Sequence, residues 1–208
     1  MKIFIPKEIN NENRVAATPD SVKKFISMGH DVIIEPSAGV RSNFGDDLYK
    51  EVGALISDES SSADIILKVG KPLLSEVEKY KDGSLLIAML DPYNNRDLID
   101  ELRNKNITTF AMEWMPRITR AQSMDVLSSQ SNLSGYKAVI EASSNFKKAM
   151  PMMMTAAGTI APAKVMVFGA GVAGLQAIAT AKRLGAVVSA TDVRLAAKEQ
   201  VESLGGKF

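Results

Sequence analysis

Short runs of Ile, Val and Leu alternate with amphipathic segments along the first 112 residues of the chain. The runs are rich in β-branched residues and predict strands, while the segments between them carry apolar residues at helical spacing. This alternation is typical of a parallel sheet joined by crossover helices. It places strands at residues 2–5, 31–35, 64–69, 84–90 and 107–112, and helices from residue 19, near residues 46–52 and 75–79, and at residues 95–104.

The first of these helices has clear start and stop signals. Thr18 offers a capping hydroxyl, Pro19 suits the first helical position, and Asp20 faces the positive end of the helix dipole. Gly29 supplies a left-handed stop before the next strand. The N-terminal half therefore predicts an α/β domain.

The regular alternation is interrupted at residues 113–124, which are polar and irregular. Val126, Leu133, Tyr136 and Ile140 then mark one face of a long helix that we expect to join two domains. We place the boundary near residue 127, so that the predicted domains are residues 1–127 and 128–208.

A stretch of low charge follows, because Lys164 is the single charged residue within residues 149–181. Its prolines and glycines, and the charge near its middle, argue against a membrane span. Met152, Met153 and Met154 either line a cofactor cleft or pack in the core. Core packing is favoured, because consecutive residues of a short segment face different ways.

The most informative segment begins at Lys164 and reads KVMVFGAGVAGLQAIATAKRLGAVVSATDVR. A buried strand, residues 165–168, runs directly into Gly169-x-Gly171-x-x-Gly174. In a dinucleotide-binding turn the first glycine allows the tight turn, the second lets a pyrophosphate approach the backbone, and the third lets the helix pack on the strand. The following helix directs its N–H groups and positive dipole end toward the phosphates.

A second strand, residues 186–191, ends at Asp192, about 20 residues beyond the turn. A carboxylate here accepts hydrogen bonds from the adenosine ribose and repels a 2′-phosphate, so NAD(H) is favoured over NADP(H). Arg194 weakens that preference, since a nearby arginine accommodates a 2′-phosphate. The alternative is a glycine-rich turn that only packs a helix on a strand. We assign cofactor binding to Gly169, Gly171, Val172, Ala173, Gly174, Asp192, Val193 and Arg194.

The amino-acid composition excludes several classes of function. The chain has 25 basic and 24 acidic residues and a formal net charge of +1, which provides no positive field for a nucleic-acid backbone or an anionic membrane. It contains no cysteine and one histidine, His30, so thiol chemistry and multi-histidine metal sites are excluded, and we assign no metal ligands. The polar N-terminus lacks the apolar core of a signal peptide.

With these segments in view, the chain resembles the NAD(H)-binding component of proton-translocating nicotinamide nucleotide transhydrogenases. The resemblance rests on PRITRAQSMDVLSSQSNLSGYKAVIEA at residues 116–142, on residues 151–194 with the glycine-rich turn, and on the closing KEQVESLGGKF. It implies an N-terminal parallel-sheet α/β domain followed by a Rossmann-type dinucleotide-binding domain.

The resemblance also implies the chemistry and the partners. In transhydrogenases the corresponding loop surrounds the dihydronicotinamide, which implies catalytic positions at Arg117, Gln122, Asp125 and Ser128. The implied reaction passes hydride from NADH to NADP⁺ on a separate NADP(H)-binding component, coupled to proton movement through membrane-spanning subunits. The chain itself would be a cytoplasmic homodimer, peripheral to the inner membrane and not membrane-spanning.

The same superfamily includes alanine dehydrogenase, which residues 6–19 and 66–72 resemble. Arg14 and Lys68 match substrate-binding residues of those enzymes, but Asp91 stands where they carry a catalytic histidine. Oxidising an amine requires a base for its proton, whereas transfer between two nicotinamides moves only hydride. We therefore favour the transhydrogenase component. An alanine-dehydrogenase-like enzyme and a non-catalytic NAD-binding remnant are the alternatives.

A complete dinucleotide fold has two halves of about three strands each. By Phe208 the sequence has supplied two of these strands and the start of a second helix. We therefore expect a truncated Rossmann domain that is inactive alone and has an exposed edge at residues 186–191.

Overall fold

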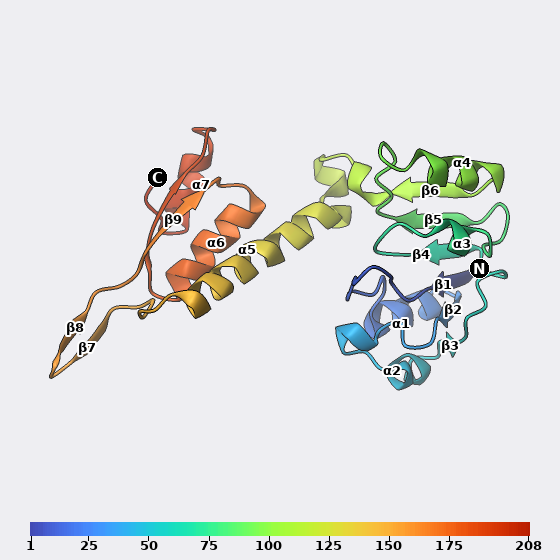
Figure 1. The fold of residues 1–208 in the computed structure, drawn as a ribbon, viewed down its shortest axis with the longest axis horizontal. Helices are drawn as coiled ribbons and strands as arrows, with labels where there is room; N and C mark the ends of the chain where they lie inside the picture. Colours follow the sequence, from blue (N-terminus) through green and yellow to red (C-terminus); the bar gives the residue numbers. More distant parts are fainter. The chain divides into compact units, whose positions relative to one another are not determined.

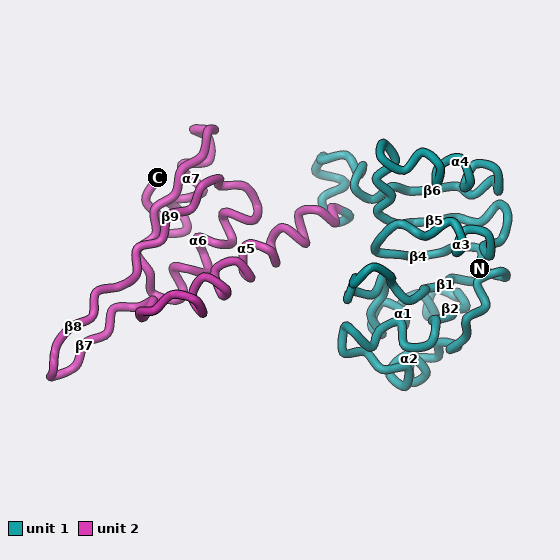
Figure 2. The backbone as a smooth tube through the Cα atoms, in the orientation of Figure 1, with its two compact units in different colours: residues 1–124 teal, residues 125–208 magenta.

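The computed structural model describes residues 1–208 and divides into two compact units, residues 1–124 (unit 1) and 125–208 (unit 2), coloured separately in Figure 2. The predicted boundary near residue 127 falls in the first turn of the helix that opens unit 2. No helix combines the length and the hydropathy needed to cross a membrane.

Unit 1 is built on a six-stranded parallel sheet with the order β3-β2-β1-β4-β5-β6 (Figure 1). The strands are β1 (Lys2–Ile5), β2 (Asp31–Ile34), β3 (Leu55–Ile56), β4 (Ile65–Leu67), β5 (Leu85–Ala88) and β6 (Thr108–Ala111). The helices are α1 (Pro19–Ser27), α2 (Asp46–Glu51), α3 (Leu74–Val77) and α4 (Arg96–Asn104), with 3₁₀ turns η1 (Val40–Ser42), η2 (Met112–Trp114) and η3 (Thr119–Met124). The predicted parallel α/β architecture is confirmed.

Local chemistry explains where α1 begins and ends. The Thr18 hydroxyl accepts a hydrogen bond from the Ser21 N–H at 3.4 Å, and Pro19 occupies the first turn. Gly29 follows the helix with φ +85°, a conformation that favours glycine. The start and stop signals read from the sequence are therefore confirmed.

The core of unit 1 includes side chains from the strands and from the helices that cross them. Ile5, Ile34 and Val22 are fully buried in one cluster, which also contains Tyr49. The Tyr49 hydroxyl donates a hydrogen bond to the Ala17 carbonyl oxygen at 2.9 Å. This bond satisfies a buried polar group and ties α2 to the segment before α1.

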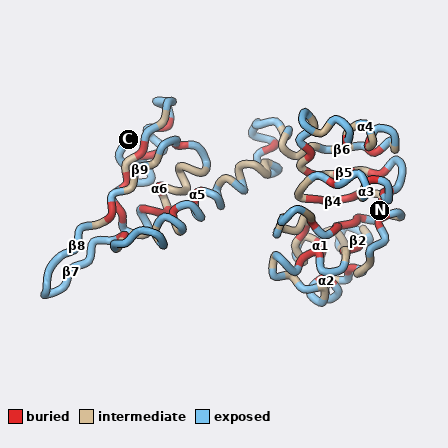
Figure 3. The backbone as a smooth tube through the Cα atoms, in the orientation of Figure 1, coloured by how far each residue is buried: buried red, intermediate tan, exposed pale blue.

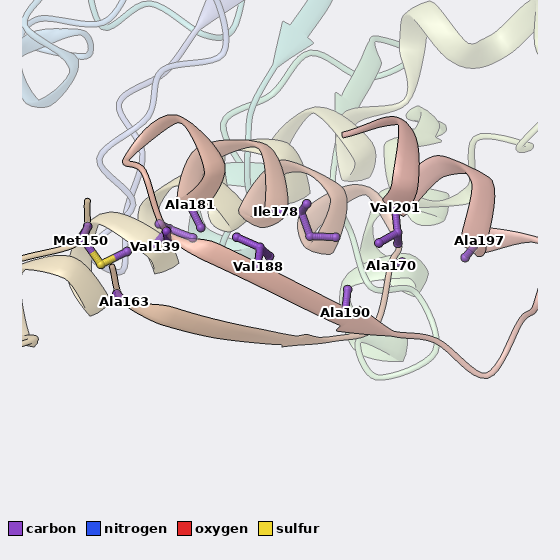
Figure 4. Packing of buried hydrophobic residues seen from close by; sticks show 11 residues of the cluster. Val139, Met150, Ala163, Ala170, Ile178, Ala181, Val188, Ala190, Ala197 and Val201 are labelled. Atoms are coloured by element: carbon purple, nitrogen blue, oxygen red, sulfur yellow. The ribbon is translucent and has the colours of Figure 1, made fainter. Parts of the chain in front are cut away.

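Unit 2 consists of a long helix, a hairpin and a parallel βαβ unit. Its elements are α5 (Val126–Asn145), β7 (Met153–Thr155), β8 (Gly158–Ile160), β9 (Lys164–Phe168), α6 (Val172–Arg183), β10 (Val187–Thr191) and α7 (Ala197–Ser203). β9 and β10 pair in parallel, with Val188 opposite Val165. Figure 4 shows the core between these strands and the helices, where Ile178 and Ala181 of α6 lie near Val188 and Val139.

The end of the chain differs from the expectation. α7 is a complete helix, and the segment after it returns beside β10, where Lys207 forms a parallel bridge with Ser189. The Lys207 N–H donates to the Val188 carbonyl oxygen at 3.0 Å, and the Ala190 N–H donates to the Lys207 carbonyl oxygen at 2.7 Å. The edge of β10 that we expected to be exposed is therefore partly paired.

The packing face of α5 also differs from the expectation. Leu133 and Tyr136 are about half exposed, while Gly135 and Val139 are buried. A Cβ on Gly135 would lie 2.1 Å from the carbonyl oxygen of Ala173 in α6. The backbones of α5 and α6 come so close that only small residues fit between them at this point. Leu133 and Tyr136 therefore lie on the outer side of α5.

The three methionines Met152, Met153 and Met154 do not pack in the core. They are exposed at and beside the β7–β8 hairpin, every residue of which is exposed (Figure 3). A two-stranded hairpin has no third strand or helix against which to bury side chains. The prediction of core packing for this segment is wrong.

Candidate nucleotide-binding site

The glycine-rich turn joins β9 to α6, and two of its glycines are required by the protein's own backbone. Gly169 has φ +95°, in the left-handed region. Gly174 lies in the first turn of α6, where a Cβ would sit 1.8 Å from the Gly169 carbonyl oxygen. The tight turn and the close packing of helix on turn therefore have the geometry that the glycine pattern predicts.

Gly171 differs from both. Its φ of −79° and ψ of −167° are open to any residue, and a Cβ there would meet no heavy atom within 4 Å. Gly171 is the N-cap of α6, and no side chain caps this helix, whereas Thr18 caps α1 and Asp125 caps α5. The first N–H groups of a helix lack intrahelical acceptors, so this end can bind an anionic group.

Asp192 links the end of β10 to the turn after β9. Its side chain is 6% exposed, and its Oδ2 atom accepts a hydrogen bond from the Ala170 N–H at 2.7 Å. Its Oδ1 atom accepts from the Arg194 N–H at 2.8 Å. The carboxylate thus lies directly beside the turn. The bond to Ala170 was not predicted from the sequence.

Arg194 holds the same carboxylate through its side chain. The Arg194 Nε atom donates to Oδ1 of Asp192 at 3.0 Å, and Nη2 donates to Oδ2 at 3.2 Å. These side-chain bonds, with the two backbone N–H bonds, hold the pKa of Asp192 well below its usual range. Asp192 is therefore ionised at neutral pH and surrounded by donors.

The other predicted cofactor positions lie around this turn in unit 2. Val172 opens α6 and is exposed, Ala173 contacts Gly135 across the α5–α6 crossing, and Val193 is fully exposed. The structure therefore brings all of the predicted cofactor-binding residues together at the β9–α6 turn and the end of β10.

The four predicted catalytic positions divide between the units. Asp125 and Ser128 meet at the start of α5, where the Ser128 N–H donates to Oδ1 of Asp125 at 2.9 Å and the Ser128 hydroxyl donates to Oδ2 at 2.6 Å. Arg117 and Gln122 are exposed residues of unit 1, the first before η3 and the second within it. The structure therefore pairs two of the four.

Lys68, the residue that matches alanine dehydrogenases, follows β4 and is fully buried. Its Nζ atom lies 2.9 Å from Oε1 of Glu76 and 3.8 Å from Oε2 of Glu8. Burial raises the pKa of Glu8, while Lys68 and the N–H groups of Val69 and Gly70 act in the opposite direction. The positive charge of Lys68 is thus balanced by carboxylates of unit 1.

Asp91 and Glu113 follow β5 and β6 and lie close together. Oε1 of Glu113 accepts hydrogen bonds from the N–H groups of Leu90 and Asp91, at 2.9 and 2.5 Å. Beside them the Trp114 and Tyr93 rings lie with centroids 5.1 Å apart and planes inclined at 47°. No group of three or more His, Cys, Asp or Glu side chains is arranged to hold a metal ion.

The parallel sheet of unit 1 and the strand–turn–helix–strand of unit 2 define a two-unit α/β protein with a Rossmann-type βαβ element. Family comparison assigns both units. Residues 4–134 match the alanine dehydrogenase/PNT N-terminal domain, and residues 138–208 match the alanine dehydrogenase/PNT C-terminal domain. The chain belongs to the alanine dehydrogenase/PNT family.

Individual relatives agree with this assignment. The chain is 56% identical to an NAD(P) transhydrogenase subunit alpha polypeptide of Rhodospirillum rubrum, an alignment that covers 100% of the chain and 57% of the relative. It is 35% identical to alanine dehydrogenase of Staphylococcus epidermidis, covering 98% and 56%. The crystal structure of transhydrogenase from Sinorhizobium meliloti superposes with a TM-score of 0.95 at 57% identity, covering 100% and 61%.

The resemblance to transhydrogenases read from the sequence is thereby confirmed. The chain spans 57% of the length of its Rhodospirillum rubrum relative.

Proposed function

We propose that this chain is the NAD(H)-binding component of a transhydrogenase. The observation that carries the proposal is the arrangement of Gly171, the start of α6 and Asp192, in a chain 56% identical to a transhydrogenase alpha subunit polypeptide.

The turn fits the pyrophosphate and adenosine of a dinucleotide. Neither backbone conformation nor packing requires glycine at residue 171, which supports a close approach by a group from outside the chain. The uncapped N–H groups of α6 would bind phosphate oxygens, and Asp192 would accept hydrogen bonds from the ribose hydroxyls. NAD(H) is favoured over NADP(H) because Asp192 is ionised.

When bound, NADH supplies the hydride, and NADP⁺ on a partner component receives it. No proton moves in this step, so the site needs groups that align the rings and exclude water. We assign this positioning to Arg117, Gln122, Asp125 and Ser128. The two hydrogen bonds between Asp125 and Ser128 support a fixed geometry at that end of α5.

The proposed partners are an NADP(H)-binding component and membrane-spanning subunits that conduct protons. The chain would lie on the cytoplasmic side of the inner membrane, attached through those subunits. We further propose a homodimer, supported by the exposed apolar side chains of the β7–β8 hairpin, among them Met153, Met154 and Ile160. Covering them by a second copy would remove apolar surface from water.

An alanine-dehydrogenase-like activity is the second candidate, favoured by the 35% identity to that enzyme and by Arg14 and Lys68. Two observations weigh against it. Lys68 is buried against Glu76 and Glu8, so it offers no free ammonium to a substrate carboxylate, and Asp91 is not a histidine.

The test uses a chimera in which this chain continues into the remaining C-terminal segment of the Rhodospirillum rubrum subunit. Mixed with the NADP(H)-binding component, the chimera should pass hydride from NADH to an NADP⁺ analogue and should not oxidise L-alanine. Robust alanine turnover would establish the second candidate instead. Nucleotide binding without either reaction would indicate a non-catalytic remnant. The 208-residue chain alone should show no transhydrogenase activity.

A further inference from the structure

We propose that Asp192 and Arg194 form one specificity-determining pair. Arg194 carries the donors that bind a 2′-phosphate, and Asp192 keeps these donors occupied. The proposal rests on the proposed function, since it concerns the adenosine end of the same nucleotide site. It replaces the view that the acid alone selects the nucleotide and the arginine opposes it.

The geometry shows what holds Arg194. Its Nε and Nη2 atoms reach the two different oxygens of Asp192, at 3.0 and 3.2 Å. The side chain is otherwise at the surface, 63% exposed, and both of its hydrogen bonds and its ion pair are with Asp192. A guanidinium that grips a carboxylate by two donors presents the same fork that it would present to a phosphate. Asp192 therefore competes directly for the phosphate-binding side of Arg194.

Charge gives the pair its selectivity. A 2′-phosphate beside Asp192 meets an ionised carboxylate and, at the same time, finds the nearest arginine already neutralised. Removal of the carboxylate charge removes the repulsion and also frees the guanidinium. Acceptance of a 2′-phosphate should therefore depend on Arg194, and should not follow from loss of the acid alone.

The bond between Asp192 and Ala170 determines which substitution removes the charge of Asp192 without loss of the contact with the turn. Oδ2 of Asp192 accepts the Ala170 N–H of the glycine-rich turn at 2.7 Å. An amide oxygen at residue 192 still accepts this N–H, so Asp192→Asn retains an acceptor for the turn while it removes the charge and the acceptor for the Arg194 donors. A shorter side chain would also remove the acceptor for the turn.

The experiment titrates the 208-residue chain with adenosine 5′-monophosphate and adenosine 2′,5′-bisphosphate, which differ only by the 2′-phosphate. The variants are Asp192→Asn, Asp192→Asn with Arg194→Ala, and Asp192→Asn with Lys198→Ala, with NMR shifts as the readout. Lys198 is the matched control, because it is an exposed cation nearby in α7 whose ion pair is with Glu202. Thermal melting checks that each variant is folded.

The wild-type chain should prefer the monophosphate. Asp192→Asn should bind the bisphosphate about tenfold more tightly than wild type does, the gain expected of a new charged fork contact at an exposed site. Arg194→Ala should abolish that gain and Lys198→Ala should preserve it. Arg194→Ala alone should sharpen discrimination against the bisphosphate several-fold, since Asp192 is then an unneutralised anion; this variant tests the pair even where Asp192→Asn does not fold.

Failure of the Asp192–Arg194 pair and failure of the nucleotide site would give different results. An equal gain with and without Arg194 would overturn the pair while leaving the nucleotide site intact. Loss of the gain with Lys198→Ala would assign it to general positive charge and overturn the pair in the same way. Relaxed or unchanged discrimination in Arg194→Ala would also overturn it. A wild-type chain that binds neither nucleotide at millimolar concentration would overturn the nucleotide site, and the pair with it.

Discussion

Three glycines that are equivalent in a sequence pattern are distinguished by the atoms around them. Gly174 is fixed by the Gly169 carbonyl oxygen, 1.8 Å from where its Cβ would be, whereas Gly171 has open space in front of it. A substitution can therefore separate what the fold requires from what a ligand requires.

Gly171→Ala should leave the melting temperature of the chain within error and weaken adenosine nucleotide binding by about tenfold or more, because the new methyl group lies where a phosphate approaches. Gly174→Ala should lower the melting temperature, because its Cβ clashes with backbone that cannot rotate away. Thermal melts and nucleotide titrations measure both. A Gly171→Ala chain that melts early, or one that binds as wild type does, would contradict this division.

Tyr49 provides a pH-dependent contribution to stability in unit 1. Burial, with a smaller effect of the Asp46 charge, raises its pKa from 10.0 to about 12. A phenol whose pKa is higher in the folded state stabilises fully below its unfolded pKa, and this contribution is lost as pH rises through the folded pKa. The stability of unit 1 should therefore decline between pH 10 and 12.

Tyr49→Phe should cost about 0.5–1.5 kcal/mol at pH 7, since it removes the hydrogen bond to Ala17. It should also flatten the alkaline decline. Tyr93→Phe, at an exposed tyrosine, is the matched control and should change neither quantity. Urea unfolding at several pH values provides the measurement, and an alkaline decline unchanged by Tyr49→Phe would assign it to another group.

Helix α5 illustrates how elements pack through residues that a hydrophobic pattern overlooks. Its large apolar residues suggested a face containing Leu133 and Tyr136, yet the contact with α6 runs through Gly135. A pattern built on hydrophobicity gives a glycine no weight, and close backbone approach between helices is a tertiary property.

Gly135→Ala should destabilise unit 2 by about 1–3 kcal/mol, because overpacking against the Ala173 backbone outweighs the better helix propensity of alanine. Faster hydrogen exchange of α5 and α6 amides would reveal the effect. Ser134→Ala, at the adjacent exposed position, should not show it. Unchanged or greater protection in Gly135→Ala would mean that the two helices separate at little cost.

Most strands and helices of unit 1 could be predicted, because β-branched runs and capping residues act locally; Lys2–Ile5 matches β1. β3 was missed because two residues cannot express an alternation, and the β7–β8 hairpin because its strands have only three residues each and combine methionine and glycine with β-branched residues. At the site, glycine spacing predicted the turn. The bond from Ala170 to Asp192 joins positions 22 apart and depends on a side-chain orientation that spacing does not encode.

Each unit of the molecule carries its own buried clusters. The cluster that contains Ile178 and Val201 draws only on unit 2, and the clusters around Ile5 and Leu86 draw only on unit 1. A core defect should therefore be felt mainly within its own unit.

Ile178→Ala should cost about 2–5 kcal/mol, through lost burial and a cavity between α6 and the β9–β10 pair. Hydrogen exchange followed by mass spectrometry should show faster exchange across unit 2 with unit 1 unchanged. Val22→Ala, in the core of unit 1, should give the reciprocal pattern at a smaller cost. Equal acceleration in both units by either variant would show that they unfold as one cooperative body.

Trp114, whose ring lies beside that of Tyr93, gives the protein a native fluorescent label. Trp114 is the only tryptophan of the chain, it belongs to unit 1, and it is about half exposed. Unit 2 contains Tyr136 as its only tyrosine or tryptophan. Indole emission therefore originates in unit 1, with no engineered fluorophore, and the unit that contains the glycine-rich turn has no indole of its own.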